Sequence, residues 1–158
     1  MDENLEFKPF FKHQHGIVFK ALNIEWLESF FVVEPYDNLV LSNPTQEIIK
    51  TGGAIFMVYM KGSIIGTFAF LKKGKYLYEF SKMAVTPLER GKGYGNKIVQ
   101  FAINYAKEQQ WETLILYSST ILENSIHLYF KYGFTEVPID PDIKYARGNI
   151  KMALELKK

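Results

Sequence analysis

Hydrophobic and polar positions alternate with different periods along the chain, and each period predicts an element. Residues 17–31 place their large apolar side chains three and four positions apart, which predicts one amphipathic helix. Its apolar face is formed by Phe19, Leu22, Trp26, Leu27, Phe30 and Phe31. Two β-rich apolar runs, 54–62 and 63–71, meet at Lys61 and Gly62, a pair typical of a hairpin turn.

The segments around these runs extend the same arrangement. A second turn at Lys73 and Gly74 leads into a strand at 76–85. The proline-bearing stretch before the first hairpin is expected to be a connection with one short helix near 44–50. The front half of the chain is therefore predicted to form an antiparallel meander.

The back half changes to an alternation of helix and strand. Beyond a glycine-rich stretch, Ile98, Phe101, Ala102 and Tyr105 recur at helical spacing and predict a helix that runs to about residue 110. A strand at 112–119 follows directly. Strand, helix and strand in this order form a crossover unit with one parallel strand pair.

The last third of the chain supplies one more helix and the closing strands. The helix is predicted at 122–133, with Asn124 as its N-cap and Gly133 at its C-terminal end. Closing strands are predicted at 134–139 and 149–156. The class is α+β, with a mixed, mostly antiparallel central sheet flanked by helices.

Composition and charge limit the classes of function. With 158 residues, 47% of them hydrophobic, residues 1–158 are predicted to form a single domain with one core. The formal charge of +2 is too small to indicate a nucleic acid partner. The absence of cysteine excludes disulfides and thiolate chemistry and fits a reducing cytosol. Because we find neither a secretory signal nor an apolar run of about 20 residues, we expect a cytoplasmic protein without a membrane partner.

The segment of greatest chemical interest is ERGKGYG at 89–95. Glycines at 91, 93 and 95 lie between a predicted strand and a predicted helix, with Arg90 and Lys92 beside them. Without Cβ atoms, such a loop can direct consecutive N–H groups at one point, and the helix N-terminus adds positive potential. This predicts a site for a phosphate or pyrophosphate. The alternative is a glycine-rich turn that only allows the helix to pack closely.

Two common phosphate-binding motifs do not fit this segment. A P-loop requires Gly-Lys-Ser/Thr after a four-residue gap, which the segment lacks. The dinucleotide fingerprint requires a glycine where Asn96 stands.

The segment resembles the R/Q-x-x-G-x-G/A pyrophosphate loop of the GNAT N-acetyltransferases. SKMAVTPLERGKGYG at 81–95 is similar to that family's strand-to-helix signature, and NSIHLYFKYGF at 124–134 is similar to its second one. The resemblance covers about residues 15–156. It implies the GNAT fold, with about six to seven strands, and transfer of an acetyl group from acetyl-CoA to a primary amine without a metal.

The resemblance also implies roles for individual residues. Backbone groups of Met83, Ala84 and Val85 would pair with the pantetheine arm of acetyl-CoA. Backbone amides of Arg90, Gly91, Lys92, Gly93, Tyr94 and Gly95 would hold the pyrophosphate, and Asn124 would hydrogen-bond the cofactor. Tyr129 would be the general acid, and Glu79 would be the general base.

The chemistry of the residues agrees with these roles. An amine arrives mostly as ammonium and must lose a proton before it attacks a thioester, and a carboxylate such as Glu79 can accept that proton, directly or through water. A phenol such as Tyr129 can protonate the leaving thiolate. The alternatives are a surface ion pair of Glu79 with Lys82 or Lys75, and a packing role for Tyr129.

The residues that bind the amine acceptor are predicted less directly than those that bind the cofactor. Glu34, Tyr36 and Asp37 follow the first helix, and Tyr145 and Arg147 precede the last strand, so both groups are candidates for substrate binding. Arg147 suits a substrate carboxylate, and Asp37 or Glu34 suits its ammonium, which together favour a zwitterionic small molecule. Solvated loop residues are the alternative. A protein amine as acceptor, a catalytically silent acyl-CoA-binding module, and a homodimer remain open.

Two histidines complete the list of candidates. His13 and His15 are two residues apart and could share a face as metal ligands. Because no third ligand accompanies them, they are predicted to be a solvent-exposed pair, and no metal is expected.

Overall fold

The computed structural model describes residues 4–141 and 147–156, and within them a seven-stranded mixed sheet is flanked by helices. In chain order the elements are β1 Leu5–Pro9, α1 Lys12–Phe30, α2 Pro35–Ser42, a π-helical turn Thr45–Ile49, β2 Ala54–Met60, β3 Ser63–Lys72, β4 Leu77–Val85, a 3₁₀ turn Pro87–Glu89, α3 Tyr94–Glu108, β5 Thr113–Ser118, α4 Glu123–Lys131, β6 Thr135–Val137 and β7 Ile150–Glu155. The strand order is β1-β2-β3-β4-β5-β7-β6, with β4 and β5 as a parallel pair. The predicted α+β class and mixed sheet are confirmed.

The chain divides into two compact units. The first contains residues 1–71 and 81–92, and the second contains residues 72–80 and 93–158. Strand β4 contributes its first four residues to the second unit and the remainder to the first. No helix in the described ranges is long and apolar enough to cross a membrane.

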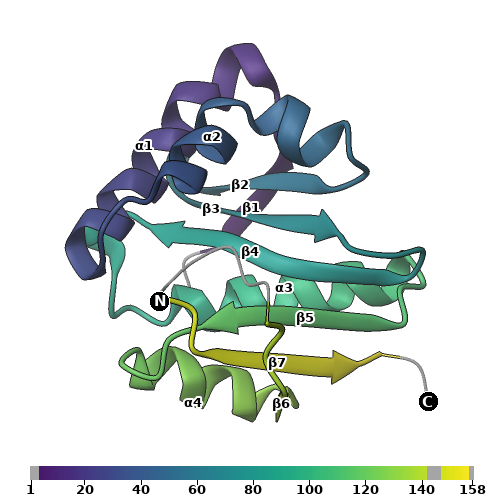
Figure 1. Cartoon of the computed structure of the whole chain (residues 1–158). Helices are drawn as coiled ribbons and strands as arrows, with labels where there is room; N and C mark the ends of the chain where they lie inside the picture. The colour runs from purple at the N-terminus through teal and green to yellow at the C-terminus, as the bar shows by residue number, and fades with distance from the viewer. Residues whose placement is uncertain (1–3, 142–146, 157–158) are drawn as a thin grey trace. The chain divides into compact units, whose positions relative to one another are not determined.

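In the first unit, α1 and α2 lie on one face of β1, β2 and β3 (Figure 1). The strands β1–β2 and β2–β3 pair antiparallel, and the turn residues Lys61 and Gly62 have φ angles of 50° and 81°, as a tight hairpin requires. The core of this unit is formed by side chains of α1, α2 and β2, among them Phe19, Leu27 and Met57. The predicted hairpin is confirmed.

Helix α1 begins five residues earlier than predicted, and a histidine is the reason. The Nδ1 atom of His15 accepts the backbone N–H of Phe11 at 2.9 Å, so the ring supplies the partner that a first-turn N–H otherwise lacks. His15 is buried, and its Nε2 lies 2.8 Å from the hydroxyl of Tyr59. The predicted exposed pair is therefore wrong, because only His13 faces solvent.

The sequence analysis missed helix α2. Pro35 occupies its first turn, and the backbone N–H of Glu34 donates to Oδ2 of Asp37 at 2.8 Å in a capping box. The proline and the acidic residues, interpreted as a connection, are thus the start signal of a helix. Strand β1 was also missed, because LEFKP is short and its apolar positions are few.

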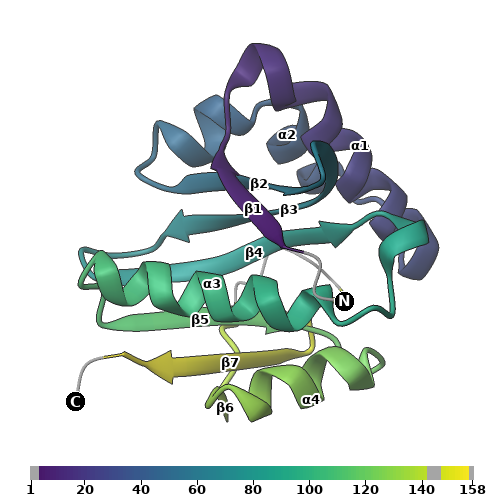
Figure 2. The same cartoon turned by 180° about the vertical axis from the view of Figure 1, so that it is seen from behind.

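In the second unit, α3 lies along β5 (Figure 2). Its buried face contains Ile98 and Ala102, as predicted, whereas Phe101 and Tyr105 are half-buried at its margin. On the same side of the sheet, the ring of Tyr78 stacks on Trp111 with ring centroids 3.6 Å apart.

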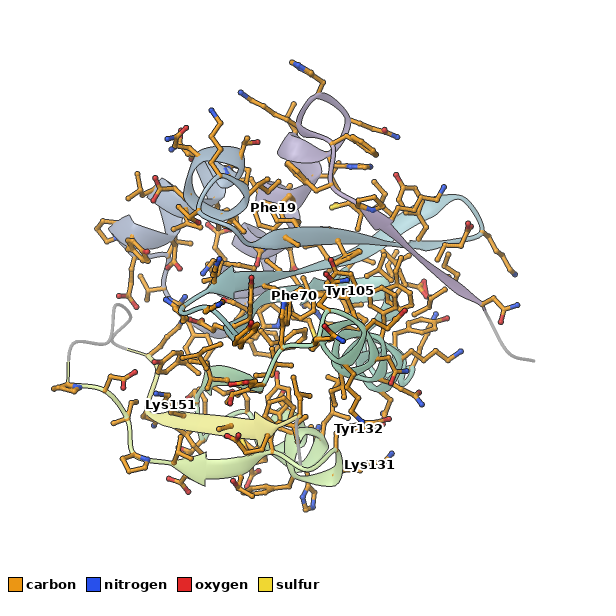
Figure 3. The ribbon with its side chains drawn as sticks, turned by 90° about the vertical axis from the view of Figure 1, so that its right-hand side faces the viewer. Phe19, Phe70, Tyr105, Lys131, Tyr132 and Lys151 are labelled. Atoms are coloured by element: carbon orange, nitrogen blue, oxygen red, sulfur yellow. The ribbon has the colours of Figure 1, made fainter. Side chains whose placement is uncertain are left out.

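Helix α4 begins at Glu123 with Leu122 as its N-cap, so the predicted N-cap role of Asn124 is wrong. Asn124 lies in the first turn instead. Near the other end, Lys131 Nζ and Tyr132 Oη donate to Oδ1 of Asn96, at 2.9 and 3.3 Å, and join the end of α4 to the first turn of α3 (Figure 3). Gly133 follows with φ 99°, the left-handed conformation that ends many helices.

Candidate active site

The glycine-rich loop has the geometry of an anion cradle. Gly91 and Gly93 have φ angles of 77° and 84°, in the left-handed region, and Gly93 is the N-cap of α3. A Cβ built on either glycine meets no protein atom within 4 Å, so the backbone there borders open space. The first N–H groups of α3 have no intrahelical partner and carry the positive end of the helix dipole.

Gly95 differs from the other two glycines. A Cβ on Gly95 would lie 3.4 Å from a terminal carbon of Leu128 on α4. The third glycine therefore faces α4, and a Cβ there would make an ordinary van der Waals contact. Gly91 and Gly93, by contrast, keep backbone accessible and suit an anion.

The side chain of Arg90 is engaged within the first unit. Its Nε donates to the carbonyl oxygen of Val85 at 2.9 Å, and its NH2 group forms an ion pair with Glu25 of α1. The guanidinium also lies over the ring of Phe30, 5.4 Å from the centroid. The neighbouring Lys92 pairs with Glu89 at 3.1 Å on the surface. The backbone N–H of Arg90 is engaged as well, because it donates to the carbonyl oxygen of Pro87 at 3.3 Å.

Strand β4 contains a local break at Lys82, whose φ of 57° is unusual for a residue with a side chain. A non-glycine residue in this region costs about 1–2 kcal/mol. The break separates Glu79 from the segment Met83, Ala84 and Val85, to which a cofactor role was assigned. It re-aims the backbone N–H and C=O groups of that segment, as a β-bulge does.

Glu79 is buried, with 6% of its surface exposed, so the interpretation as a surface ion pair does not describe it. Its Oε1 lies 3.4 Å from Nζ of Lys73, a partner that the sequence analysis did not name. The Nζ of Lys75, named there as an alternative, lies over the ring of Tyr76 instead.

Two further polar residues, Tyr117 and Lys151, share the sheet face of Glu79. Glu79 pairs with Ile115 on β5, and Tyr117, two residues further on, pairs with Lys151 on β7, so these side chains point to one side. Figure 3 shows Lys151 at β7, apart from Lys131 at the end of α4 and its C-cap residue Tyr132.

Asp140 joins this group from the segment after β6. It accepts hydrogen bonds from the hydroxyl of Tyr117 and from Nζ of Lys151, the latter at 3.1 and 3.2 Å. The hydrogen bond from Tyr117 and then those from Lys151 lower the pKa of the Asp140 carboxyl below its ordinary value. Sequence spacing gave no signal for this cluster, because its members come from three distant segments.

Tyr129 lies on α4 with its ring edge-on to Phe134, at a centroid distance of 5.9 Å. It is buried, and burial raises the pKa of its phenol to about 12. The hydroxyl is therefore neutral, and able to donate a hydrogen bond, over the whole physiological range. Asn124, on the first turn of the same helix, is exposed.

The acceptor candidates are placed separately. Asp37 is buried and uses Oδ2 for the cap of α2, whereas Tyr36 beside it is 36% exposed. Arg147 is half-buried in the turn before β7, and Tyr145 lies outside the described residues. Among the described residues, no group of three or more His, Asp or Glu side chains could hold a metal ion.

A family model described as an acetyltransferase (GNAT) domain matches residues 51–136, more than half of the chain. The chain belongs to the GNAT acetyltransferase family. The matched residues include all of β4, the glycine loop and α4.

Relatives and solved structures agree with this assignment. The GNAT chain is 28% identical to the N-acetyltransferase YvbK of Bacillus subtilis over 112 residues, which cover 69% of this chain and 72% of YvbK. It is 22% identical to N-acetyltransferase 8 of Rattus norvegicus, over 74% of this chain and 57% of the rat protein, so it spans little more than half of that relative.

Two solved structures show the same fold. A GNAT acetyltransferase from Staphylococcus aureus Mu50 superposes with a TM-score of 0.84 at 17% identity, covering 98% of this chain and all of that one. The yncA protein of Salmonella typhimurium, solved with its cofactor acetyl-CoA, superposes with a TM-score of 0.72 at 20% identity, covering 98% and 95%. The GNAT fold expected from the sequence is confirmed.

Proposed function

We propose that this GNAT protein transfers an acetyl group from acetyl-CoA to the primary amine of a small molecule. The observation that carries the proposal is the open backbone at Gly91 and Gly93, directly before the N-terminus of α3. A pyrophosphate is bound by unobstructed backbone N–H groups of this kind. Membership of the GNAT acetyltransferase family supports acetyl transfer as the reaction.

The residues present fit acetyl-CoA as co-substrate. Backbone amides of residues 91–95 would hold its pyrophosphate, since that of Arg90 donates to Pro87. Backbone groups of residues 83–85 would pair with its pantetheine arm, and Asn124 would add a side-chain hydrogen bond. When bound, acetyl-CoA supplies the acetyl thioester that the amine attacks. N–H groups near the break at Lys82 would polarise the carbonyl oxygen of the thioester, as oxyanion sites do.

We assign the removal of the amine proton to Glu79. Its carboxylate would accept a proton from the acceptor's ammonium, directly or through one water, and the nitrogen lone pair would then be free to attack. Burial of the carboxylate suits this role, because charge interactions are stronger where water is excluded.

We assign stabilisation of the leaving sulfur to Tyr129. A phenol with a pKa of about 12 is a weaker acid than a thiol, whose ordinary pKa is about 8.5. Complete proton transfer from Tyr129 to the thiolate is therefore uphill, and hydrogen-bond donation is the step that the phenol supports, with water supplying the proton afterwards.

For the acceptor we propose a zwitterionic small molecule, such as an amino acid. Arg147 would form a bidentate pair with its carboxylate, and Tyr36 and Asp37 would contribute on the ammonium side.

A calorimetric titration with acetyl-CoA, followed by a thiol-release assay over a panel of amines, tests the proposal. The panel should contain amino acids, polyamines, simple alkylamines and a peptide with a free lysine. We expect saturable binding of acetyl-CoA and turnover of carboxylate-bearing amines, with a raised KM for these alone in Arg147→Lys. Binding without turnover would indicate a silent acyl-CoA module, and turnover of the peptide alone would indicate a protein acceptor.

A further inference from the structure

The pair formed by Glu79 and Lys73 is unequal in its exposure to solvent. The side chain of Glu79 is 8% exposed, whereas that of Lys73 is 42% exposed, and the charged atoms lie 3.4 Å apart. A carboxylate removed from water is destabilised unless an opposite charge or hydrogen bonds compensate it. Lys73 is the cation that the structure places against this carboxylate.

The backbone holds Lys73 in place. The N–H groups of Lys73 and Gly74 both donate to the carbonyl oxygen of Leu77, at 2.9 and 3.1 Å, and close the turn before β4. Glu79 follows two residues after Leu77 on the strand that this turn starts. The turn therefore fixes the origin of the Lys73 side chain relative to Glu79, while its flexible stem leaves the ammonium able to move.

Lys73 also acts on a second carboxylate. After the hydrogen bonds from Tyr117 and Lys151, the positive charge of Lys73 contributes to lowering the pKa of Asp140. Two carboxylates, Glu79 and Asp140, and two ammonium groups, Lys73 and Lys151, thus share one region of the second unit. Lys73 is drawn toward two anions, which favours its staying in this region.

We propose that Lys73 is a positioning residue for the base of the reaction, and this inference rests on the assignment of Glu79 under the proposed function. Its ammonium holds the buried carboxylate in one orientation through the ion pair, and it takes no proton itself. During the reaction the proton leaves the acceptor nitrogen for the Glu79 oxygen, and the electron pair stays on nitrogen. Lys73 retains all three of its protons throughout.

The decisive variants are Lys73→Met, which removes the charge and keeps the stem, and Lys73→Arg, which restores the charge. Lys75→Met, in the same turn, is the matched control. With the best amine of the panel, we expect Lys73→Met to lower kcat/KM by about tenfold and to move the acidic limb of the pH–rate profile to higher pH. Lys73→Arg should recover most of the rate and the original limb, and Lys75→Met should match the wild type.

A double-variant cycle separates positioning from a merely structural role. In a Glu79→Gln background, Lys73→Met should change neither kcat/KM nor the pH profile further, because no carboxylate remains to be held. Loss of stability without a displaced pH profile in Lys73→Met would overturn the inference, as would Lys73→Arg behaving like Lys73→Met. Full activity in Glu79→Gln would instead overturn the base assignment, and the inference with it.

Discussion

The Nε atom of Arg90 donates a hydrogen bond to the carbonyl oxygen of Val85 at 2.9 Å, across the turn that links β4 to the glycine loop. The same guanidinium forms an ion pair with Glu25, so one side chain contacts both the end of β4 and helix α1. A lysine at this position keeps the charge but cannot make both contacts, because it lacks the planar fork.

We therefore expect Arg90→Lys to lower the free energy of unfolding by about 1.5–3 kcal/mol, the range of one hydrogen bond from a charged group. It should also weaken acetyl-CoA binding, because the loop loses its anchor. Urea denaturation and calorimetric titration measure the two effects. Lys92→Met, which removes only a surface ion pair, is the control and should change stability by less than about 0.5 kcal/mol.

Gly93 and Gly62 offer a matched pair for testing the cradle. Both have left-handed φ angles, 84° and 81°, and a Cβ on either meets no protein atom within 4 Å. Alanine should thus cost each site a similar backbone strain, about 1–2 kcal/mol. Only Gly93→Ala, and more so Gly93→Val, should weaken acetyl-CoA binding in a calorimetric titration. Equal affinity in Gly93→Val and wild type would refute the pyrophosphate assignment.

Replacing Tyr129 with phenylalanine removes one hydroxyl and leaves the packing against Phe134 in place. We expect kcat to fall about 100-fold, within the range of a lost proton or hydrogen-bond donor, with acetyl-CoA affinity nearly unchanged. Steady-state kinetics and calorimetry report the two quantities. Tyr132→Phe, at the C-cap of the same helix, is the control, and a similar loss of kcat in both variants would point to disturbed packing of α4.

His15 predicts a loss of stability on mild acidification. Burial, and then the charge of Lys8, lower the pKa of the folded His15 below its ordinary value of 6.5. As the pH falls below about 6.5, the unfolded chain takes up a proton that the folded protein resists, so the free energy of unfolding decreases. Urea midpoints at pH 7.5 and 5 should differ less in His15→Gln than in wild type. His13→Gln, which replaces an exposed neighbour, should behave like wild type.

Local patterns in the sequence were sufficient for much of the fold. The hairpin at Lys61 and Gly62 and the helix that follows Gly93 depend on neighbours within a few residues, and both were predicted. Helix α2 was missed because Pro35 was interpreted as a break, although it stands where a proline starts a helix. The same error assigned the capping carboxylate of Asp37 to a loop.

The candidate site was predictable only in its contiguous parts. The positive φ angles of Gly91 and Gly93 follow from residue type and spacing, and a short motif contains them. The contacts of Asp140 cannot be derived from residue type and spacing. Its partners Tyr117 and Lys151 are brought together only by the pairing of β5 with β7. Long-range pairs of this kind are determined by tertiary structure, which no local period encodes.

The two tryptophans of the chain fall one in each compact unit, and this gives the protein two built-in spectroscopic reporters. Trp26 is half-buried on α1 beside Phe30, whereas Trp111 is buried and stacked on Tyr78, so Trp111 should emit at shorter wavelength. Trp26→Phe and Trp111→Phe each leave a single emitter. If the chain unfolds as one cooperative domain, the unfolding midpoint measured by fluorescence will equal the midpoint measured by far-UV circular dichroism in each variant. The unfolding of each unit can thus be followed by the intrinsic fluorescence of its own tryptophan, without any added label.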